Sequence, residues 1–325
     1  MKRSEKCFGC YQSLDSGVHS GNYHNKCSKK LFATEAPPLV GFGIDELEEM
    51  TKSSLSQHLG ITGVQAKISV DLEKRKNNPS HRLMIVGLWG EYILKPPTER
   101  FPLISLVEDV TMHMAEVAGI TTARHGLIQL RSGELVYVTR RFDREKKTKK
   151  KIATEDFCQL SGLLTESKYD TSTEKAGKII LKFSSNPGLD AVAFFDLILF
   201  SFVVGNADMH LKNFSLIRNV EDEIVLSPAY DLLSTKILLP ADREDLALTV
   251  NGKKTKIRRK DFVALGENLE IEPKAIENSF KRILDAVPGM KTVLENSFLP
   301  DEMKKKYDQL LMSKLQTFQK SGANA

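Results

Sequence analysis

Two polar side chains in one short segment have the types and the spacing that phosphoryl transfer needs. The segment runs Gly205-Asn-Ala-Asp-Met-His-Leu-Lys-Asn-Phe214, so Asp208 and Asn213 stand five positions apart. An aspartate so placed can accept the proton of a substrate hydroxyl, while the asparagine reaches a magnesium ion on the other side of the transferring phosphate. We therefore predict that Asp208 is a general base and that Asn213 is a magnesium ligand.

A second carboxylate follows on the same part of the chain. Asp231 ends the segment Ser227-Pro-Ala-Tyr-Asp231, after two strand-like pieces at residues 213–217 and 223–226. A hairpin of these pieces would return the chain beside the first segment and bring Asp231 to the same cation. Magnesium takes few carboxylates together with phosphate oxygens, so Asn213, Asp231 and a nucleotide suffice. The spacing of Asp208 and Asn213 matches the HRDxxxxN loop of protein kinases, and Asp231 mirrors their DFG aspartate by its place after the hairpin.

Chance offers an alternative, because Asp and Asn are common in turns. The order of polar groups along the chain argues against it: a segment with two glycines at 60–67, then Lys95 at a strand end, Glu108 on the next helix and Asp208. In protein kinases a glycine-rich loop covers the phosphates, a strand lysine binds them, and a helix glutamate orients that lysine. The ordinary alternatives are a β-turn for 60–67, a solvated strand end for Lys95 and a solvated helix face for Glu108.

The N-terminal region contains two pairs of residues of the types that bind metal ions. Cys7 and Cys10 form the first pair, and His24 and Cys27 form the second, each with two residues between. This spacing is typical of tetrahedral zinc. The alternative is a small cysteine-containing turn without metal. Cys158 is isolated in the sequence and is expected to be buried.

Hydrophobic patterning predicts which elements carry these residues. We expect a strand at 68–72, hairpins of 83–86 with 91–94 and of 127–130 with 135–139, and helices at 44–52 and 107–118. After a lysine-rich run at 146–151 the chain is mostly helical. We predict an α+β, two-lobed fold like that of protein kinases. Residues 1–45 would form a Cys/His unit, which would be zinc ribbon-like if it binds metal. Residues 46–142 would form an N-lobe with a phosphate loop, and residues 143–325 a mostly helical C-lobe with the catalytic loop.

Composition favours a soluble, cytoplasmic protein. The 325 residues are 41% hydrophobic and 27% charged, with a net charge of +5. The longest apolar stretch, 191–204, is interrupted by Asp196 and Ser201 and is shorter than the roughly 18 residues of a membrane span. The run at 146–151 is either a solvated loop or a contact for nucleic acid or an acidic partner.

Several of these segments together resemble one family. GNADMHLKNF, SPAYD, YILKPP, TGVQAK and RRFDR are similar to motifs of the HipA family, the kinase toxins of bacterial toxin–antitoxin systems. The resemblance covers residues from about 55 to 320. The chain is shorter than a full HipA and is most similar to HipT of the three-part HipB–HipS–HipT systems, in which a HipA subdomain is a separate small protein, HipS.

The resemblance implies a role for each matching residue. ATP would be the phosphate donor, with Mg²⁺ as cofactor and Asp208 as base. His210 would belong to the catalytic residues together with Asp208, and its role would be to organise the catalytic loop. The residues implied at the nucleotide or its metal are Thr62, Gly63, Val64, Gln65, Ala66 and Lys67 of the phosphate loop, Lys95 with Glu108, Arg140, Arg141 and Phe142 beside the adenine, and His210, Lys212, Asn213 and Asp231.

The chain departs from the family at its regulatory serines. HipA-like kinases phosphorylate themselves on a serine at the phosphate loop, whereas this chain has Gly60-Ile-Thr62-Gly63. Thr62 keeps a hydroxyl, and Ser54 and Ser56 lie just upstream. A phosphate there would add about −1.5 to −2 charge and could expel the loop from the nucleotide site. We expect autophosphorylation at Ser54, Ser56 or Thr62; a polar helix end is the alternative.

The resemblance also implies a substrate and partners. The substrate would be an aminoacyl-tRNA synthetase, glutamyl- or tryptophanyl-, and the partners would be a HipS-like protein and a DNA-binding HipB-like antitoxin. DNA would be contacted only through the antitoxin, and no membrane would be involved. Two other classes remain open: a non-catalytic module that docks an antitoxin or DNA, and a kinase for a small molecule or lipid.

Overall fold

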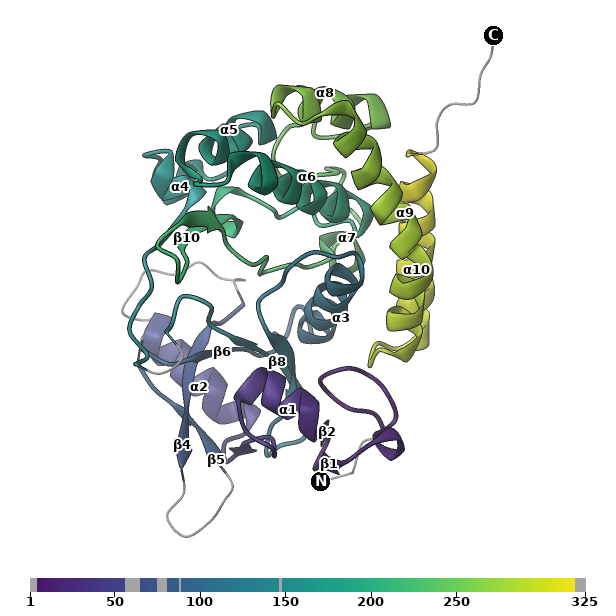
Figure 1. Cartoon of the computed structure of the whole chain (residues 1–325). Helices are drawn as coiled ribbons and strands as arrows, with labels where there is room; N and C mark the ends of the chain where they lie inside the picture. Colours follow the sequence, from purple (N-terminus) through teal and green to yellow (C-terminus); the bar gives the residue numbers. More distant parts are fainter. Residues whose placement is uncertain (1–4, 56–64, 75–80, 88, 146–147, 319–325) are drawn as a thin grey trace. The chain divides into compact units, whose positions relative to one another are not determined.

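The computed structural model describes residues 5–55, 65–74, 81–87, 89–145 and 148–318 (Figure 1). The chain divides into two compact units. The first comprises Met1–Val110, Ala123–Arg144 and Asn296–Leu299, and the second comprises Thr111–Thr122, Glu145–Glu295 and Pro300–Ala325. The boundary falls within helix α3 (Ile104–Val117).

A six-stranded sheet in the order β3-β5-β4-β6-β8-β7 forms the centre of the first unit, counting the described residues. Every neighbouring pair is antiparallel except β3 with β5. The strands are β3 (Leu39–Val40), β4 (Ile68–Lys74), β5 (His81–Ile85), β6 (Tyr92–Lys95), β7 (His125–Gln129) and β8 (Leu135–Arg140). The predicted strand at 68–72 and the hairpin of β7 with β8 are confirmed.

The predicted hairpin of residues 83–86 with 91–94 is wrong. Both strands exist, but β4 lies between them, with Val70 opposite Ile85 on one side and Tyr92 on the other. Gly90, just before β6, lies directly against the backbone of β4. A Cβ atom there would lie 2.5 Å from the carbonyl oxygen of Val70, so the chain can pass this close only where it has no side chain.

The N-terminal segment packs into the core of this first unit. It contains a short pair of strands, β1 (His19–Ser20) and β2 (Tyr23–His24), and helix α1 (Asn25–Phe32). Tyr23 and Phe32 are buried with Tyr92 of the sheet. Helix α2 (Ile44–Leu55) follows and contains the predicted helix at 44–52.

One buried helix, α6 (Pro187–Val203), forms the centre of the second unit. Its apolar residues point in all directions, which is typical of a helix enclosed by protein. Residues 191–204 are therefore a core helix and its C-cap. Around it the unit has α4 (Phe157–Leu160), α5 (Thr173–Phe183), α7 (Thr235–Leu238), α8 (Arg259–Asn268), α9 (Pro273–Asn296) and α10 (Asp301–Gln316).

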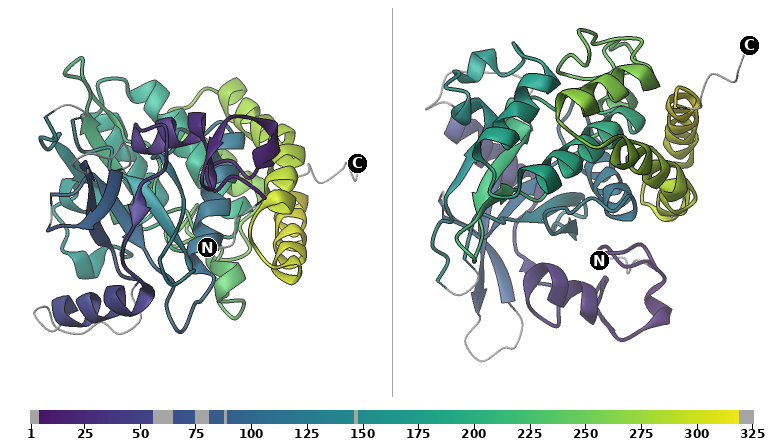
Figure 2. Two further views of the ribbon diagram at one scale, coloured as in Figure 1. Left: turned by 90° about the horizontal axis from the view of Figure 1, so that it is seen from below. Right: turned by 45° about the horizontal axis from the view of Figure 1, so that its top comes forward.

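Helices α9 and α10 lie side by side in Figures 1 and 2, and an ion pair of 2.8 Å joins Lys291 to Asp308. Helix α10 also contacts α6. Among the described residues, no helix has the length and apolar character that crossing a bilayer requires.

A three-stranded sheet in the order β11-β10-β9 completes the second unit. β10 (Ser215–Arg218) and β11 (Ile224–Leu226) form the predicted hairpin, with Ile217 opposite Val225. The sequence did not predict β9 (Thr154–Asp156), which pairs with the other side of β10. The segment that contains Asp208 connects α6 to this sheet.

Candidate active site

The chain turns sharply between α6 and the predicted catalytic loop, and Gly205 makes the turn. Its φ is +67°, and the N–H of Asn206 donates to the carbonyl of Ser201 at 2.8 Å. A left-handed glycine at this position is a common helix ending. A side chain here would also collide with Leu310. The end of α6 therefore fixes the direction in which the loop leaves.

Side chains then hold the loop backbone in place. Asn206 is buried, and its Oδ1 accepts a hydrogen bond of 3.1 Å from the N–H of Asp208. The N–H of Ala207 donates to Thr235 Oγ1 at 2.9 Å. Asp208 is exposed, and the hydroxyl of Tyr169 donates to its Oδ1 at 2.6 Å. The loop thus presents an accessible carboxylate on a fixed backbone.

Asn213 lies beside Asp208, as the five-residue spacing predicted. A short 3-10 turn, Leu211–Asn213, brings it back, and Asn213 Nδ2 donates to the carbonyl oxygen of Asp208 at 2.9 Å. This bond uses the amide nitrogen, so Oδ1 of Asn213 is the atom that can meet a cation. The side chain is largely buried, which fixes its orientation.

The hairpin of β10 and β11 returns the chain to this loop. Tyr230, at the end of the return, donates its hydroxyl to the carbonyl of Lys212 at 2.9 Å and lies 2.7 Å from the hydroxyl of Ser215. Asp231 follows with a φ of +60°, a left-handed conformation that few non-glycine residues adopt. Such backbone strain clusters at functional sites.

His210 connects these groups electrostatically. Burial lowers the pKa of His210 below its ordinary value of 6.5, and the carboxylates of Asp208 and Asp231 oppose this shift, which places both acids near the ring. The Tyr169 ring contacts it edge-on, with centroids 5.0 Å apart. Within the described residues its Nδ1 has no hydrogen-bond partner. The geometry suits a neutral imidazole that shapes the loop.

In the first unit, Lys95 and Glu108 form a buried ion pair. Lys95 ends β6 and is 4% exposed, and Glu108, on α3, is 1% exposed. Ser105 Oγ donates to the carbonyl of Lys95 at 2.7 Å, which ties the start of the helix to the strand. The predicted pairing is thus present. Burying two charges costs free energy unless their geometry is good, so a buried pair often has a functional reason.

Three further basic residues predicted at the nucleotide form ion pairs with carboxylates. Arg140 contacts Glu91 at 2.7 Å, and Arg141 contacts Asp143, two positions on, at 2.7 Å. Lys212 lies 2.7 Å from Asp156. These contacts neither require nor exclude a nucleotide, so the roles of Arg140, Arg141, Lys212 and the neighbouring Phe142 stay predictions.

Part of the predicted phosphate loop lies outside the described residues. This applies to Thr62, Gly63 and Val64. Of the predicted phosphorylation sites upstream of the loop, Ser56 also lies outside the described residues, and Ser54 is within α2 with its side chain undescribed. The end of the loop is described, from Gln65 through Ala66 to Lys67. Gln65 Nε2 donates to the carbonyl of Pro96 at 3.0 Å and to that of Lys95 at 3.3 Å. The loop end is therefore fixed to the residues around Lys95.

The sequence prediction missed two contacts to Asp208. Asn206 could have been found, because an Asn side chain often binds the backbone two residues on. Tyr169 gave no signal, because it lies 39 positions from Asp208 in the sequence and joins it only through the fold.

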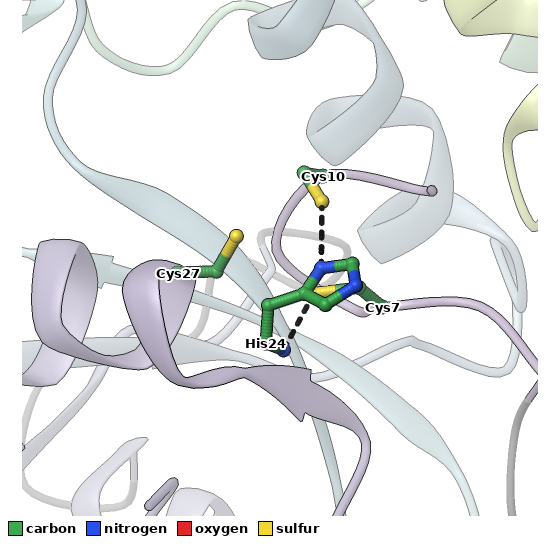
Figure 3. A group of neighbouring side chains, drawn as sticks. All are labelled: Cys7, Cys10, His24 and Cys27. Carbon is green, nitrogen blue, oxygen red and sulfur yellow. Dashed lines mark hydrogen bonds between the residues drawn. The ribbon is translucent and has the colours of Figure 1, made fainter. Parts of the chain in front are cut away.

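The predicted zinc ligands gather in the first unit. Ligand atoms of Cys7, Cys10, His24 and Cys27 all lie within 4.8 Å of one another (Figure 3). Cys158, in the second unit, is buried as predicted.

Comparisons with known proteins place these features in context. The profile of the HipA-like C-terminal domain matches residues 59–290. A protein of Haemophilus influenzae named "Putative kinase" is 27% identical over 315 residues, which is 88% of each chain. "Putative kinase Y4mE" of Sinorhizobium fredii is 31% identical over 212 residues, 62% of this chain and 48% of that protein. The chain therefore spans about half the length of this second relative.

Two solved structures share the fold. HipA of Shewanella oneidensis MR-1, in a complex with HipB and its operator DNA, has a TM-score of 0.64 at 20% identity, over 79% of this chain and 64% of that one. The proinflammatory kinase CtkA of Helicobacter pylori has a TM-score of 0.52 at 18% identity, over 70% of this chain and 86% of that one. At this identity the likeness shows an α+β fold of the same kind.

Proposed function

The chain belongs to the HipA-like C-terminal domain family, and from this we propose that it is a kinase that transfers the γ-phosphate of ATP to serine or threonine in a protein. Two relatives carry the name of kinases, which supports this activity. The arrangement of Asp208, Asn213 and Asp231 around one loop is the observation that carries the proposal. In this proposal the first unit is the N-lobe and the second unit is the C-lobe.

Asp208 is the base. Its carboxylate is exposed and its backbone is held by Asn206 and by Asn213. The hydrogen bond from Tyr169 orients one carboxylate oxygen and leaves the other for the substrate hydroxyl. A positioned base of this kind contributes about 10²- to 10⁴-fold to a rate.

Asn213 and Asp231 would hold magnesium with the nucleotide phosphates. One amide oxygen and one carboxylate, completed by phosphate oxygens and water, form the hard oxygen ligand set that Mg²⁺ prefers. The ion would neutralise charge on the phosphates. The chain's own contribution is to fix the two ligands, through the bond from Asn213 to Asp208 and through the hairpin before Asp231.

Lys95 binds a phosphate of ATP, and Glu108 orients it. Their burial excludes competing water from the pair, and the ring of Tyr137 lies 5.4 Å from the lysine Nζ. The same pairing of a strand lysine with a helix glutamate recurs in protein kinases.

We also propose that the kinase is the toxin of a bacterial toxin–antitoxin system and acts in the cytoplasm. The fold shared with a HipA that is bound to HipB and operator DNA supports a HipB-like antitoxin partner. The family motifs of the chain are consistent with the HipT type and a HipS-like partner, and an aminoacyl-tRNA synthetase, glutamyl- or tryptophanyl-, is the proposed substrate. DNA would be reached through the antitoxin.

Autophosphorylation at Ser54, Ser56 or Thr62 belongs to the same proposal. Intact-mass analysis after incubation with ATP and Mg²⁺ should show added phosphate, and peptide mapping should place it at one of these three hydroxyls. An unchanged mass would contradict it.

Radiolabelled ATP mixed with a cell extract tests the activity against its rivals. We expect label in a protein band that mass spectrometry identifies. Label in a small molecule or lipid would instead favour the small-molecule kinase. No label anywhere would favour a non-catalytic docking module.

A further inference from the structure

Four side chains near the N-terminus form a compact group that the kinase reaction does not use. Cys7 and Cys10 lie in a loop, His24 ends β2, and Cys27 lies in the first turn of α1. Their ligand atoms are within 4.8 Å of one another, and Figure 3 shows the side chains around a common centre. None of the three cysteines forms a disulfide.

We propose that these four residues bind one zinc ion as a closed, tetrahedral structural site. Three sulfur atoms and one imidazole nitrogen are a ligand set of structural zinc. Bond lengths of about 2.3 Å for Zn–S and about 2.0 Å for Zn–N separate a sulfur and a nitrogen ligand by roughly 3.5 Å in a tetrahedron. The distance from Cys10 Sγ to His24 Nδ1 is 3.4 Å.

Neighbouring groups prepare these ligands for a cation. Nε2 of His24 lies 3.0 Å from the carbonyl oxygen of Ser13, so a proton on Nε2 is bonded and the Nδ1 lone pair faces the sulfur atoms. The N–H groups of Gly9 and His24 donate to Cys7 Sγ at 3.4 and 3.3 Å. Cys7 thus accepts hydrogen bonds, as a thiolate does.

Cys158 shows how this chain satisfies a buried thiol without metal. Its Sγ lies 3.3 Å from the carbonyl oxygens of Leu163 and Leu164, to which the thiol can donate. In the N-terminal group, by contrast, Cys7 Sγ accepts hydrogen bonds from backbone N–H groups. Gly9 also fits the closed geometry, because a Cβ atom there would lie 2.7 Å from Tyr23 and 3.1 Å from Cys27.

The proposed site fixes a segment that contacts helix α3. Tyr11 follows Cys10 directly and donates its hydroxyl to Asp109 Oδ2 at 2.5 Å. Asp109 Oδ1 in turn lies 2.9 Å from Nδ1 of His125 on β7. Asp109 is next to Glu108, the partner of Lys95. The zinc site therefore positions the start of α3 through Tyr11. A further effect on Lys95, through Glu108, would matter for catalysis, and only this consequence rests on the proposed kinase activity.

Metal analysis of the full chain, purified without a polyhistidine tag, tests the site. We expect about one zinc per chain in the wild type and in Cys158→Ser, and its loss in Cys10→Ser and Cys27→Ser. A wild type that contains no zinc and takes up none when Zn²⁺ is added would overturn the site, as would iron in its place.

Cobalt substitution gives a second readout if the cysteine variants do not fold. Co²⁺ added to the chelated wild type should produce the intense visible bands of a tetrahedral thiolate complex, and Zn²⁺ should displace them. The weak spectrum of octahedral cobalt would contradict the proposal.

Hydrogen–deuterium exchange tests the connection to α3. Removing zinc should raise deuterium uptake at residues 5–32 and 104–110 and leave α10 unchanged. Tyr11→Phe should retain zinc and still raise uptake at 104–110. If uptake at 104–110 did not change in either case, the positioning role would be wrong. None of these measurements reads phosphoryl transfer, so they are independent of the kinase proposal.

Discussion

At the scale of single residues, the loop after α6 combines one exposed acid with buried groups that hold it. Asp208 is accessible, whereas Asn206, His210 and Asn213 are buried and bonded to the loop or packed against it. An active site needs this combination, because a reacting group must be reachable and must not move. The spacing in the sequence predicted Asp208 and Asn213, and the family resemblance added His210. Neither predicted Asn206 or the more distant Tyr169.

The burial of His210 predicts a pH dependence of stability. Because the pKa of His210 in the folded chain is below its ordinary value, the unfolded chain binds more protons between the two values. Stability should therefore fall as the pH drops from about 7.5 through the ordinary histidine range to about 5.5. Urea unfolding at both pH values measures this.

His210→Gln provides the comparison, because glutamine does not titrate. The wild type should lose more stability than the variant over this pH range. Equal losses would show that burial of this imidazole contributes nothing.

Breaking the buried ion pair should destabilise the chain. Glu108→Gln keeps the size of the side chain but leaves Lys95 buried beside a neutral group. Removing one member of a buried pair typically costs about 3–5 kcal/mol. Asp285→Asn is the matched control, because its pair with Lys281 is exposed and should cost at most about 0.5 kcal/mol. Equal free energies of unfolding for the two variants would contradict the importance of burial.

At the scale of elements, periodicity identified the helices and strands well, but their partners less well. The hairpins of β7 with β8 and of β10 with β11 were predictable because short turns join adjacent strands. β4 lies between β5 and β6, where Gly90 comes close to Val70, and β9 joins β10 across about 60 positions of sequence. Pairings of this kind depend on contacts that local pattern does not encode.

Substituting Gly205, at the start of the loop after α6, should destabilise the chain. Gly205→Ala forces a φ of +67° on alanine and places its Cβ 2.8 Å from Leu310, at an expected cost of about 2 kcal/mol or more. Gly188→Ala is the control. It lies in the first turn of α6 with open space around it, and should be neutral or stabilising by up to about 1 kcal/mol. Thermal unfolding of both variants measures the difference, and a neutral Gly205→Ala would contradict the assigned role.

At the scale of the whole molecule, the two units contain different parts of the proposed chemistry. The first has the Lys95–Glu108 pair and the Cys/His group, and the second has Asp208, Asn213 and Asp231. The sequence predicted the α+β fold class and the residues of both groups. It could not predict that the N-terminal segment shares its core with the sheet, because Tyr23 and Phe32 meet Tyr92 only in the fold.

Toxicity is a property of the whole chain and tests the proposed role in cells. Expression of the wild type without antitoxin should arrest growth, and Asp208→Asn should remove the arrest at equal protein level. Growth inhibition that survives Asp208→Asn undiminished would rule out the kinase mechanism of toxicity.

The role of Asp208 as the base can be measured as the rate of γ-phosphate transfer from labelled ATP to protein. Asp222→Asn is the control, because Asp222 has a left-handed φ of 66° that asparagine accepts and lies in an exposed turn of the same unit. We expect Asp222→Asn to keep the wild-type rate, and Asp208→Asn to stay folded and to be slower by about 10²- to 10⁴-fold. A folded Asp208→Asn with the wild-type rate would contradict this role.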